Sequence, residues 1–271
     1  MEDWLHQRWP PFGELLGARR QGAAHLRRDL PCQDACHAAW QKIHALPTLA
    51  LAIADGHGGT AYDRSEVGAE LAVRESVKLL FEFAFEFHDP RQLLNNLRAD
   101  FARILRKNWR DAVLAHAHSL SPTPAEQQST IRRYGTTLLT ALLQPEQVFA
   151  GQLGDGKIIR IQADGTSREP FPPDPMLLGT ETYSLCSEAC DKLWQTGVWS
   201  RQAGETLLLT TDGLSDSFAN DEEFYRFAGS LHTLLSEQGT EYVAGQLPQW
   251  LDRYSREGSG DDVTLLLLFP H

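Results

Sequence analysis

Aspartates recur in the sequence where an apolar, strand-like run meets a turn. Three runs end in an Asp-Gly dipeptide and a fourth begins after two aspartates: Asp55-Gly56, Asp155-Gly156, Asp212-Gly213 and Asp261-Asp262. The end of a strand is a rigid place for a functional side chain, and the neighbouring loop can admit a ligand. Carboxylates that converge on one point need a positive charge to neutralise them. The pattern therefore predicts a cation site.

Each aspartate also has a purely structural interpretation. Asp155 lies in an Asp-Gly pair between two strand-like runs, which is a strong signal for a tight hairpin turn, and Asp164 is similar. Asp212 is compatible with a simple turn, and Asp261 with the acidic end of a polar loop. Asp55 is harder to explain in this way, because "DGHGG" supplies three glycines where a turn needs one. The extra glycines free the backbone for close approach by a ligand.

The type of ligand atom indicates the type of cation. Oxygen ligands without a cluster of His and Cys favour the hard cations Mg²⁺ and Mn²⁺ over zinc. Two such ions about 3.5–4 Å apart can lower the pKa of a shared water and stabilise the attacking and leaving oxygens of a phosphoryl displacement. The residues are thus suited to hydrolysis of phosphate esters without a covalent intermediate.

The four cysteines form two pairs of identical spacing, Cys32/Cys36 and Cys186/Cys190. Such pairs are compatible with a shared zinc site, although zinc pairs more often have two intervening residues. Four cysteines are too few for a disulfide scaffold in a chain of 271 residues. We therefore interpret them as reduced, unliganded thiols.

Hydrophobic periodicity predicts strands and helices that alternate in groups. Strands are expected at residues 48–54, 135–143, 147–153, 157–162, 206–213 and 263–269. Helices are expected at about residues 63–87, 92–117, 221–237 and 240–256. Because helices come in pairs and consecutive strands are joined by short turns, the pattern favours an α+β sandwich of antiparallel sheets covered by helix pairs. No repeat or linker divides the sequence, so residues 1–271 are expected to form a single domain.

The composition argues against several classes of partner. The chain has 36 acidic and 25 basic residues and a formal charge of −11, whereas nucleic acids and anionic membranes bind clustered Lys and Arg. It contains no apolar run long enough to span a membrane. Its first residues are too polar and too interrupted by proline for a signal peptide. We expect a cytoplasmic protein with no nucleic-acid partner and no membrane partner.

Six motifs carry a resemblance to a known family. In order, they are "LPCQDA", "ADGHGG", "YGTTLLTALL", "GQLGDGKIIRI", "LLLTTDGLSD" and "SGDDVTLLLL". With these motifs, from about residue 17 to residue 269, the sequence resembles the metal-dependent PP2C (PPM) Ser/Thr protein phosphatases. The resemblance implies a four-layer α-β-β-α sandwich, in which helix pairs flank a central antiparallel β-sandwich. It also implies a centre of two Mn²⁺ or Mg²⁺ ions at one end of the sandwich.

The resemblance assigns roles to the aspartates. Asp55 would bridge both metal ions, and the backbone carbonyl of Gly56 would bind the second ion. Asp212 and Asp261 would complete the first metal site, and Asp34 would orient or ligate metal-bound waters. A water that bridges the two ions would attack the phosphate.

Two further roles follow from the same resemblance. Asp155 matches an aspartate that, in bacterial members, helps to hold a third and weaker metal. His57 would be the general acid that protonates the leaving serine or threonine oxygen, which matters most for a poor alkoxide leaving group. Histidine at this position resembles the eukaryotic pattern, since many bacterial relatives lack it.

Two positions depart from the family pattern. The first acidic motif is commonly Glu-Asp, whereas this chain has Gln33 before Asp34. A neutral carbonyl oxygen would hold the second metal more weakly, or through water. The family often places a phosphate-binding arginine four residues before this pair, where the chain has Asp29. The neighbouring Arg28 is the candidate replacement, since a guanidinium can bind phosphate through two hydrogen bonds.

A flap-like segment at about 166–204 lies where the family carries a variable region beside the active site. We predict no regular secondary structure for this segment. Its Trp194 and Trp199 are compatible either with docking of a partner or with simple packing.

The leading functional hypothesis is a protein-serine/threonine phosphatase. It would be a monomer that hydrolyses phosphoserine and phosphothreonine in phosphoproteins, opposite a Ser/Thr kinase in signalling. Gln33 and Asp29 motivate an alternative, a catalytically weak pseudo-phosphatase that binds phosphoproteins as a signalling module. A third hypothesis, a hydrolase of small phosphate metabolites, would use the same metals.

Overall fold

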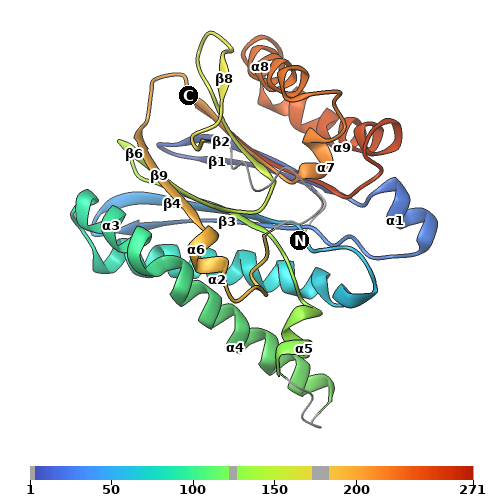
Figure 1. Cartoon of the computed structure of the whole chain (residues 1–271). Coiled ribbons are helices and arrows are strands. Elements are labelled where there is room, and N and C mark those ends of the chain that lie inside the picture. The colour runs from blue at the N-terminus through green and yellow to red at the C-terminus, as the bar shows by residue number, and fades with distance from the viewer. Residues whose placement is uncertain (1–3, 122–126, 173–182, 271) are drawn as a thin grey trace.

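The strands of the protein form two antiparallel sheets (Figure 1). The computed structural model describes residues 4–121, 127–172 and 183–270. Within these residues one sheet contains, in spatial order, β3 (Ala35–Ile43), β4 (Leu46–Ala54), β5 (Leu138–Leu143), β6 (Gln147–Leu153) and β9 (Gln195–Ser200). The other contains β1 (Trp4–Trp9), β2 (Gly13–Arg20), β11 (Val263–Phe269), β10 (Thr206–Thr210), β7 (Lys157–Ile161) and β8 (Ser167–Arg168).

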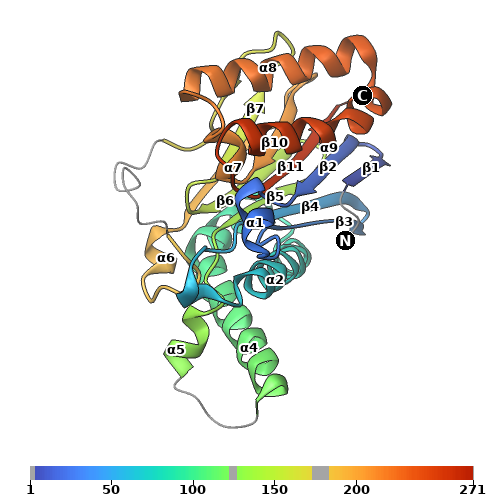
Figure 2. The ribbon, with the colours of Figure 1, turned by 90° about the vertical axis from the view of Figure 1, so that its right-hand side faces the viewer.

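Helices cover the outer face of each sheet (Figure 2). Helices α2 (Ser65–Glu86) and α4 (Ala102–Leu120) lie on the β3–β9 sheet. Helices α8 (Asp221–Gln238) and α9 (Thr240–Glu257) lie on the β1–β8 sheet. The shorter helices are α1 (Ala23–Arg28), α3 (Pro90–Asn96), α5 (Gln127–Arg132), α6 (Cys190–Leu193) and α7 (Asp212–Ser215). The predicted four-layer α-β-β-α sandwich is confirmed.

Strand β4 shows why its apolar run is buried on both sides. Successive side chains of a strand point to opposite faces of the sheet. Ala50, Ala52 and Ala54 therefore pack toward α2, while Leu49, Leu51 and Ile53 pack between the two sheets. Alanines on the helix side let α2 approach closely, and larger residues fill the space between the sheets.

The predicted helix at 92–117 is divided in the structure. Asp89 caps α3, because its carboxylate accepts hydrogen bonds from the backbone N–H groups of Arg91 and Gln92 at 3.0 and 2.9 Å. A π-helical turn, Leu97–Phe101, then leads into α4. The buried residues Leu105, Trp109 and Val113 recur at a spacing of four and fix which side of α4 faces the core.

The segment at 166–204 is more regular than predicted. It contains α6 and also β9, which pairs with β6 and forms one edge of its sheet. The half-buried β9 side chains give no strong alternation in the sequence, so the strand becomes recognisable only once β6 offers it an edge. Residues 173–182 of this segment, which include part of "PFPPDP", lie outside the described residues.

The register brings several strand ends to one end of the sandwich. Ala35 at the start of β3 pairs with Ala54 at the end of β4. Lys157 at the start of β7 pairs with Thr210 at the end of β10. The loops that follow or precede these residues carry the aspartates singled out in the sequence. Among the described residues, no helix has the length and apolar character needed to cross a membrane.

Candidate metal centre

Six aspartates lie near strand ends at this end of the sandwich. Each is within two residues of a strand: Asp34, Asp55, Asp155, Asp212, Asp261 and Asp262. The first five are the residues predicted from the sequence to hold metal, and Asp262 is an addition. Their carboxyl groups act on one another electrostatically, although they come from both sheets.

The pKa values of three of these aspartates, Asp34, Asp55 and Asp212, show how unfavourable it is to ionise them without a cation. Burial raises the pKa of Asp55 well above its ordinary value, and the negative charge of Asp34 raises it further. Burial also raises the pKa of Asp212 to about 7, with a further contribution from the charge of Asp155. For Asp34, burial and the nearby charge of Asp262 raise the pKa. A divalent cation would remove this repulsion and stabilise the ionised carboxylates.

Asp34 has an oxygen atom that is available to a metal or to a metal-bound water. Its Oδ2 accepts a hydrogen bond from Thr211 Oγ1 at 2.8 Å. Its Oδ1 is buried and has no hydrogen-bond partner among the described residues. A buried carboxylate oxygen without a partner is costly in free energy, so the residues present fit a bound cation.

Asp55 is held through its backbone by the "YGTT" motif. Thr136 Oγ1 donates a hydrogen bond to the Asp55 carbonyl at 2.7 Å, and the Thr137 N–H donates to the same oxygen at 2.8 Å. The Asp55 N–H donates to Thr137 Oγ1 at 3.1 Å. The scaffold thus holds Asp55 through its backbone, and its side chain interacts with the carboxyl group of Asp212.

Two glycines near His57, Gly56 and Gly135, are required by close packing. A Cβ atom on Gly56 would lie only 2.6 Å from the Gln33 carbonyl oxygen and 2.7 Å from that of Ser65. A Cβ atom on Gly135 would lie 2.9 Å from Cδ2 of the His57 ring. The His57 N–H donates to the Gly135 carbonyl at 3.0 Å. The motif therefore packs the loop of His57 tightly against its neighbours.

The His57 ring is packed against an aromatic side chain. The centroids of the His57 and Tyr62 rings lie 5.1 Å apart in an edge-to-face arrangement. Burial lowers the pKa of His57, and the negative charge of Asp155 opposes this effect. His57 thus lies within electrostatic reach of one of the predicted metal-binding aspartates.

Gln33 uses its amide nitrogen within the protein. Its Nε2 donates hydrogen bonds to Ser65 Oγ at 2.5 Å and to the His57 carbonyl oxygen at 3.2 Å. A glutamate at this position has no N–H group and could not make these bonds while ionised. Gln33 therefore ties the loop that carries His57 to the beginning of α2.

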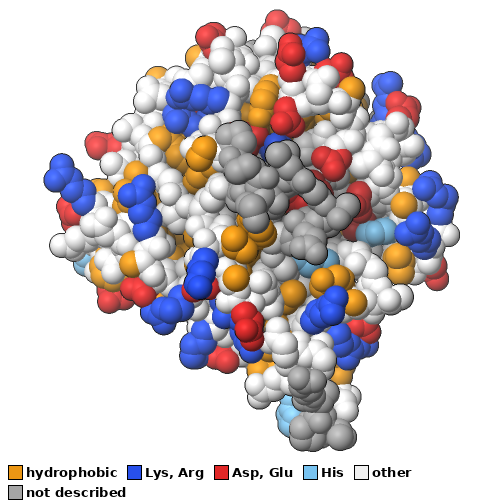
Figure 3. Space-filling view, in the orientation of Figure 1, with side chains coloured by type: hydrophobic (Ala, Val, Ile, Leu, Met, Phe, Trp, Pro, Cys, Tyr) orange, Lys and Arg blue, Asp and Glu red, His pale blue; other side chains and the backbone are white. Residues whose placement is uncertain are grey.

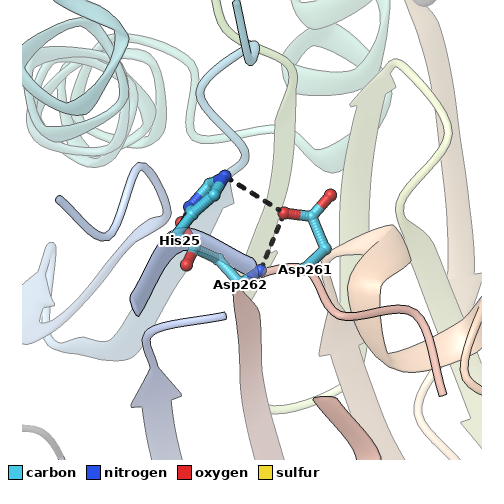
Figure 4. Close-up of side chains that lie close together, drawn as sticks. All are labelled: His25, Asp261 and Asp262. Atoms are coloured by element: carbon cyan, nitrogen blue, oxygen red, sulfur yellow. Dashed lines mark hydrogen bonds and ion pairs between the residues drawn. The ribbon is translucent and has the colours of Figure 1, made fainter. Parts of the chain in front are cut away.

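Asp262 forms a buried connection that the sequence did not reveal (Figure 4). Its carboxylate accepts hydrogen bonds from the N–H groups of Gly22 at 2.5 Å and Gln33 at 2.6 Å. His25 Nδ1 lies 2.9 Å from Asp262 Oδ2, and His25 Nε2 lies 3.7 Å from Asp261 Oδ1. The hydrogen bond to Asp262 raises the pKa of His25, although burial lowers it in part.

The side chains of His25, Asp261 and Asp262 are also close enough to hold a metal ion, because one ligand atom from each lies within 4.8 Å of the others. The two neighbouring aspartates differ in role, however. The oxygens of Asp262 accept backbone hydrogen bonds, whereas the Asp261 side chain is 54% exposed. Asp262 and His25 therefore connect the loops, whereas much of the Asp261 side chain stays accessible from outside.

The turn at Asp155 is not the hairpin that its sequence suggested. Strands β6 and β7 belong to different sheets, so the turn crosses from one sheet to the other. Gln152 Nε2 supports it by donating to the carbonyls of Gly154 at 3.2 Å and Gly156 at 3.0 Å. Gly154 has a φ of 104°, a backbone conformation that favours glycine.

Asp212 lies at the first position of α7 and not at the end of a strand. Strand β10 ends at Thr210, two residues earlier than Asp212 and three earlier than the predicted end at Gly213. A Cβ atom on Gly213 would lie 2.0 Å from the Asp262 carbonyl oxygen, which explains glycine there. The nearby Asp216 also belongs to the acidic group, since burial and the charge of Asp155 raise its pKa.

The predicted phosphate-binding Arg28 is the last residue of α1 and is exposed. Its side chain makes no hydrogen bond or ion pair with any described residue. Another cation, Arg19 of β2, reaches the acidic motif, where its Nη1 donates to the Asp34 carbonyl oxygen at 3.3 Å. Sequence reasoning did not single out Arg19, because only the pairing of β2 in the sheet brings it there.

None of the four cysteines, all of which lie in the described residues, forms a disulfide, and Cys36, Cys186 and Cys190 are buried. Within the described ranges, no group of side chains suited to a metal includes a cysteine. The structure therefore gives no support to a zinc site shared between the two pairs.

The chain is similar to known proteins over nearly its whole length. A model of the family described as Protein phosphatase 2C matches residues 21–252. The chain belongs to this family. It is 27% identical over 263 residues to Serine/threonine-protein phosphatase 3 of Escherichia coli (strain K12), covering 93% of this chain and 96% of that protein. The resemblance seen in the motifs is confirmed, and the protein is an enzyme, a serine/threonine protein phosphatase.

Solved structures of PP2C-type phosphatases share the fold. The crystal structure of a bacterial serine phosphatase has a TM-score of 0.66 at 18% identity and covers 96% of this chain and 98% of its own. The catalytic domain of the phosphatase PstP in complex with two manganese ions has a TM-score of 0.57 at 18% identity, covering 95% and 98%. The PP2C family depends on manganese or magnesium, in agreement with the oxygen-rich group of carboxylates in this chain.

Proposed function

We propose that this PP2C protein hydrolyses phosphoserine and phosphothreonine in phosphoproteins with two Mn²⁺ or Mg²⁺ ions held by the carboxylates at the end of the sandwich. The observation that supports this most is the buried acidic group itself. Asp34, Asp55 and Asp212 have raised pKa values, and Asp34 keeps one buried oxygen without a partner. When bound, the two ions would activate a water and neutralise the phosphoryl oxygens.

The proposed ligands follow the family pattern. Asp55 would bridge the ions, the Gly56 carbonyl would serve the second, and Asp212 and Asp261 would serve the first. Asp34 would hold waters through its free oxygen. The remaining ligand, Asp155, would help to hold a third and weaker ion beside the first two.

His57 is the proposed general acid for the leaving alkoxide oxygen. Burial lowers its pKa in the protein alone, and the charge of a bound phosphate would favour the protonated ring. Gly135 and Tyr62 fix the direction of the imidazole, and Gln33 fixes its backbone carbonyl. Arg28 is proposed to contact the substrate phosphate, since its guanidinium is exposed beside α1. We expect a cytoplasmic monomer that acts opposite a Ser/Thr kinase.

The test is hydrolysis of a phosphothreonine peptide with Mn²⁺ or Mg²⁺, compared with the same reaction in excess chelator. Turnover is expected only with the metal. Metal-independent turnover, or binding of the phosphopeptide without turnover, would contradict the proposal, and the second result would favour the pseudo-phosphatase. A panel of sugar phosphates and nucleotides separates a phosphoprotein phosphatase from a hydrolase of small metabolites.

The general acid is tested with two leaving groups. His57→Asn is expected to lower kcat for the phosphothreonine peptide by about 10²-fold or more, because a general acid contributes about 10²–10⁴-fold when the leaving group is poor. Hydrolysis of p-nitrophenyl phosphate, whose leaving group needs no protonation, should change much less. Equal losses with both substrates would assign His57 to structure and not to proton transfer.

A further inference from the structure

Helix α4 presents a row of cations on one side. The cations are Arg103, Arg106, Lys107 and Arg110. They line a groove of about 310 Å³ together with Asp111 of the same helix and Asp191 of α6. Figure 3 shows Lys and Arg side chains gathered over this helix. The chain has a formal charge of −11, so four cations on one side of a single helix are a local concentration of positive charge.

Two of the four cations are already neutralised by neighbours on the same helix or just before it. Arg103 Nη2 lies 2.6 Å from Asp100 Oδ1, and Lys107 Nζ lies 2.7 Å from Asp111 Oδ2. Both pairs are highly exposed, so they leave the groove accessible.

Arg106 and Arg110 differ from those two residues. Neither forms an ion pair with any described residue, and Nε of Arg106 is buried without a hydrogen-bond acceptor. Both lie near α6. Burial raises the pKa of the Cys190 thiol to about 12, and the positive charges of Arg106 and Arg110 act in the opposite direction. Two guanidinium groups with unused donors therefore face the same groove.

The position of these cations is fixed by the opposite side of α4. Leu105, Trp109 and Val113 are buried in the core, so the cationic side cannot turn inward. Like charges three or four residues apart on a helix repel one another and destabilise it. An anionic ligand in the groove would relieve this repulsion.

We propose that the groove on α4 binds a carboxylate-rich, extended segment of a protein substrate, at a distance from the phosphorylated residue. A helix rises about 1.5 Å per residue, so the cations from Arg103 to Arg110 extend over about 10 Å. An extended peptide covers that length with about three residues at about 3.3 Å each. A row of this length is matched by several Asp or Glu side chains in succession, whereas a single phosphate would meet only one end of it. The binding of an acidic peptide in the groove does not depend on the proposed function. The statement that this peptide belongs to a substrate does rest on it.

The groove is connected to the metal centre by a short described segment. Ser184 Oγ accepts a hydrogen bond from the Thr136 N–H at 3.2 Å, and the same Thr136 holds the Asp55 carbonyl. From Ser184 the chain runs through Cys190 to Asp191, which lines the groove. The segment beside the groove therefore also contacts a residue that holds the catalytic end in place.

The experiment measures binding of a short fluorescein-labelled peptide of alternating Glu and Asp, without phosphate, by fluorescence anisotropy. The variant R106Q/R110Q removes the two unpaired guanidinium groups. The control R226Q/R253Q removes the same charge from exposed arginines of α8 and α9 that already pair with Glu223 and Glu257. We expect R106Q/R110Q to bind at least about fivefold more weakly and the control to bind like the unmodified protein. Added salt should weaken binding of the unmodified protein more than that of R106Q/R110Q.

Equal affinity of the unmodified protein and R106Q/R110Q would overturn the proposal. So would tight binding of labelled polyuridylate that is lost in R106Q/R110Q while the acidic peptide binds unchanged, because the groove would then serve nucleic acid. Hydrolysis of p-nitrophenyl phosphate should be the same in all three proteins. If none of them hydrolyses it, the proposed function fails while the peptide result still decides the role of the groove.

Discussion

Strand β7 is bounded by two Asp-Gly turns that look alike in the sequence and differ in the structure. The turn at Asp164 joins β7 to β8, which pair with each other, and it is an exposed hairpin. Its carboxylate accepts a hydrogen bond from the Thr166 N–H at 2.9 Å, which lowers the pKa of Asp164. The turn at Asp155 joins strands of different sheets, and the charge of its carboxylate acts on Asp212.

The difference lies in which strands pair and not in the dipeptide. When the two flanking strands pair, the aspartate only has to close the turn, and its carboxylate does so by accepting a hydrogen bond from the Thr166 N–H. When they belong to different sheets, the turn lies at the end of the sandwich, beside loops from distant parts of the chain. Asp34, Asp55 and Asp212 at that end have raised pKa values, whereas the pKa of Asp164 is lowered.

The largest expected difference concerns activity, and it compares Asp212, which lies near the start of β7 through the pairing of Thr210 with Lys157, with Asp164 beyond the end of β7. Asp212→Asn removes a proposed metal ligand, so kcat/KM for a phosphothreonine peptide at saturating Mn²⁺ should fall at least about a hundredfold. Asp164→Asn, the matched change at the opposite end, should leave kcat/KM within about twofold. Steady-state kinetics on the three proteins checks this, and similar losses in both variants would remove the functional distinction between the two ends.

The metal-free protein should show the next largest effect, in its stability against pH. A carboxyl group with a raised pKa in the folded state binds its proton more tightly when folded. The stability that this proton contributes is therefore fully present at pH values below the ordinary pKa of the group. It is lost as the pH rises through the pKa of the folded state, which is about 7 for Asp212. In chelator, the free energy of unfolding should fall by about 1–4 kcal/mol between about pH 5 and pH 8.

Denaturant titrations at several pH values measure this slope. Asp212→Asn should flatten it, Asp164→Asn should not, and Mn²⁺ should stabilise the unmodified protein at the upper end of the range. A metal-free protein whose stability does not depend on pH in this range would contradict the raised pKa values.

The smallest expected effect concerns the region near Asp164. Here the protein should lose stability as the pH falls, and not as it rises. Burial lowers the pKa of His232, a residue of α8 whose Nδ1 lies 2.9 Å from Thr206 Oγ1. A histidine with a lowered pKa binds its proton less tightly when folded, so stability is complete above the ordinary value of about 6.5 and falls below it. His232→Gln should reduce the loss of stability on acidification, as followed by thermal melting at several pH values. An unchanged dependence in the variant would exclude His232 as a source of this loss.

Much of the metal centre could be predicted because its signals are local. Asp55 and Asp212 follow long apolar runs, and the glycines beside them mark close backbone approaches. Other features depend on contacts between distant parts of the chain. Whether Asp155 lies in a hairpin depends on the sheet that each neighbouring strand joins, and no local pattern specifies that.

The Asp261-Asp262 pair illustrates a second limit of prediction. Neighbouring residues at the start of a strand point in opposite directions, so one aspartate faces outward and the other is buried. The sequence alone does not say which of the two is buried. The partner of the buried one, His25, lies on a helix of six residues, too short to show a helical period.

Strand β4 has a consequence for how the metal centre can move. It is paired on both edges, by β3 and β5, and covered on both faces by the core. We expect its amide hydrogens to be among the slowest to exchange with solvent, because the sheets and helices around it must open together to expose it. Asp55 directly follows this strand. Its position should therefore persist on the timescale of global unfolding, so any adjustment that admits substrate must come from the loops opposite it.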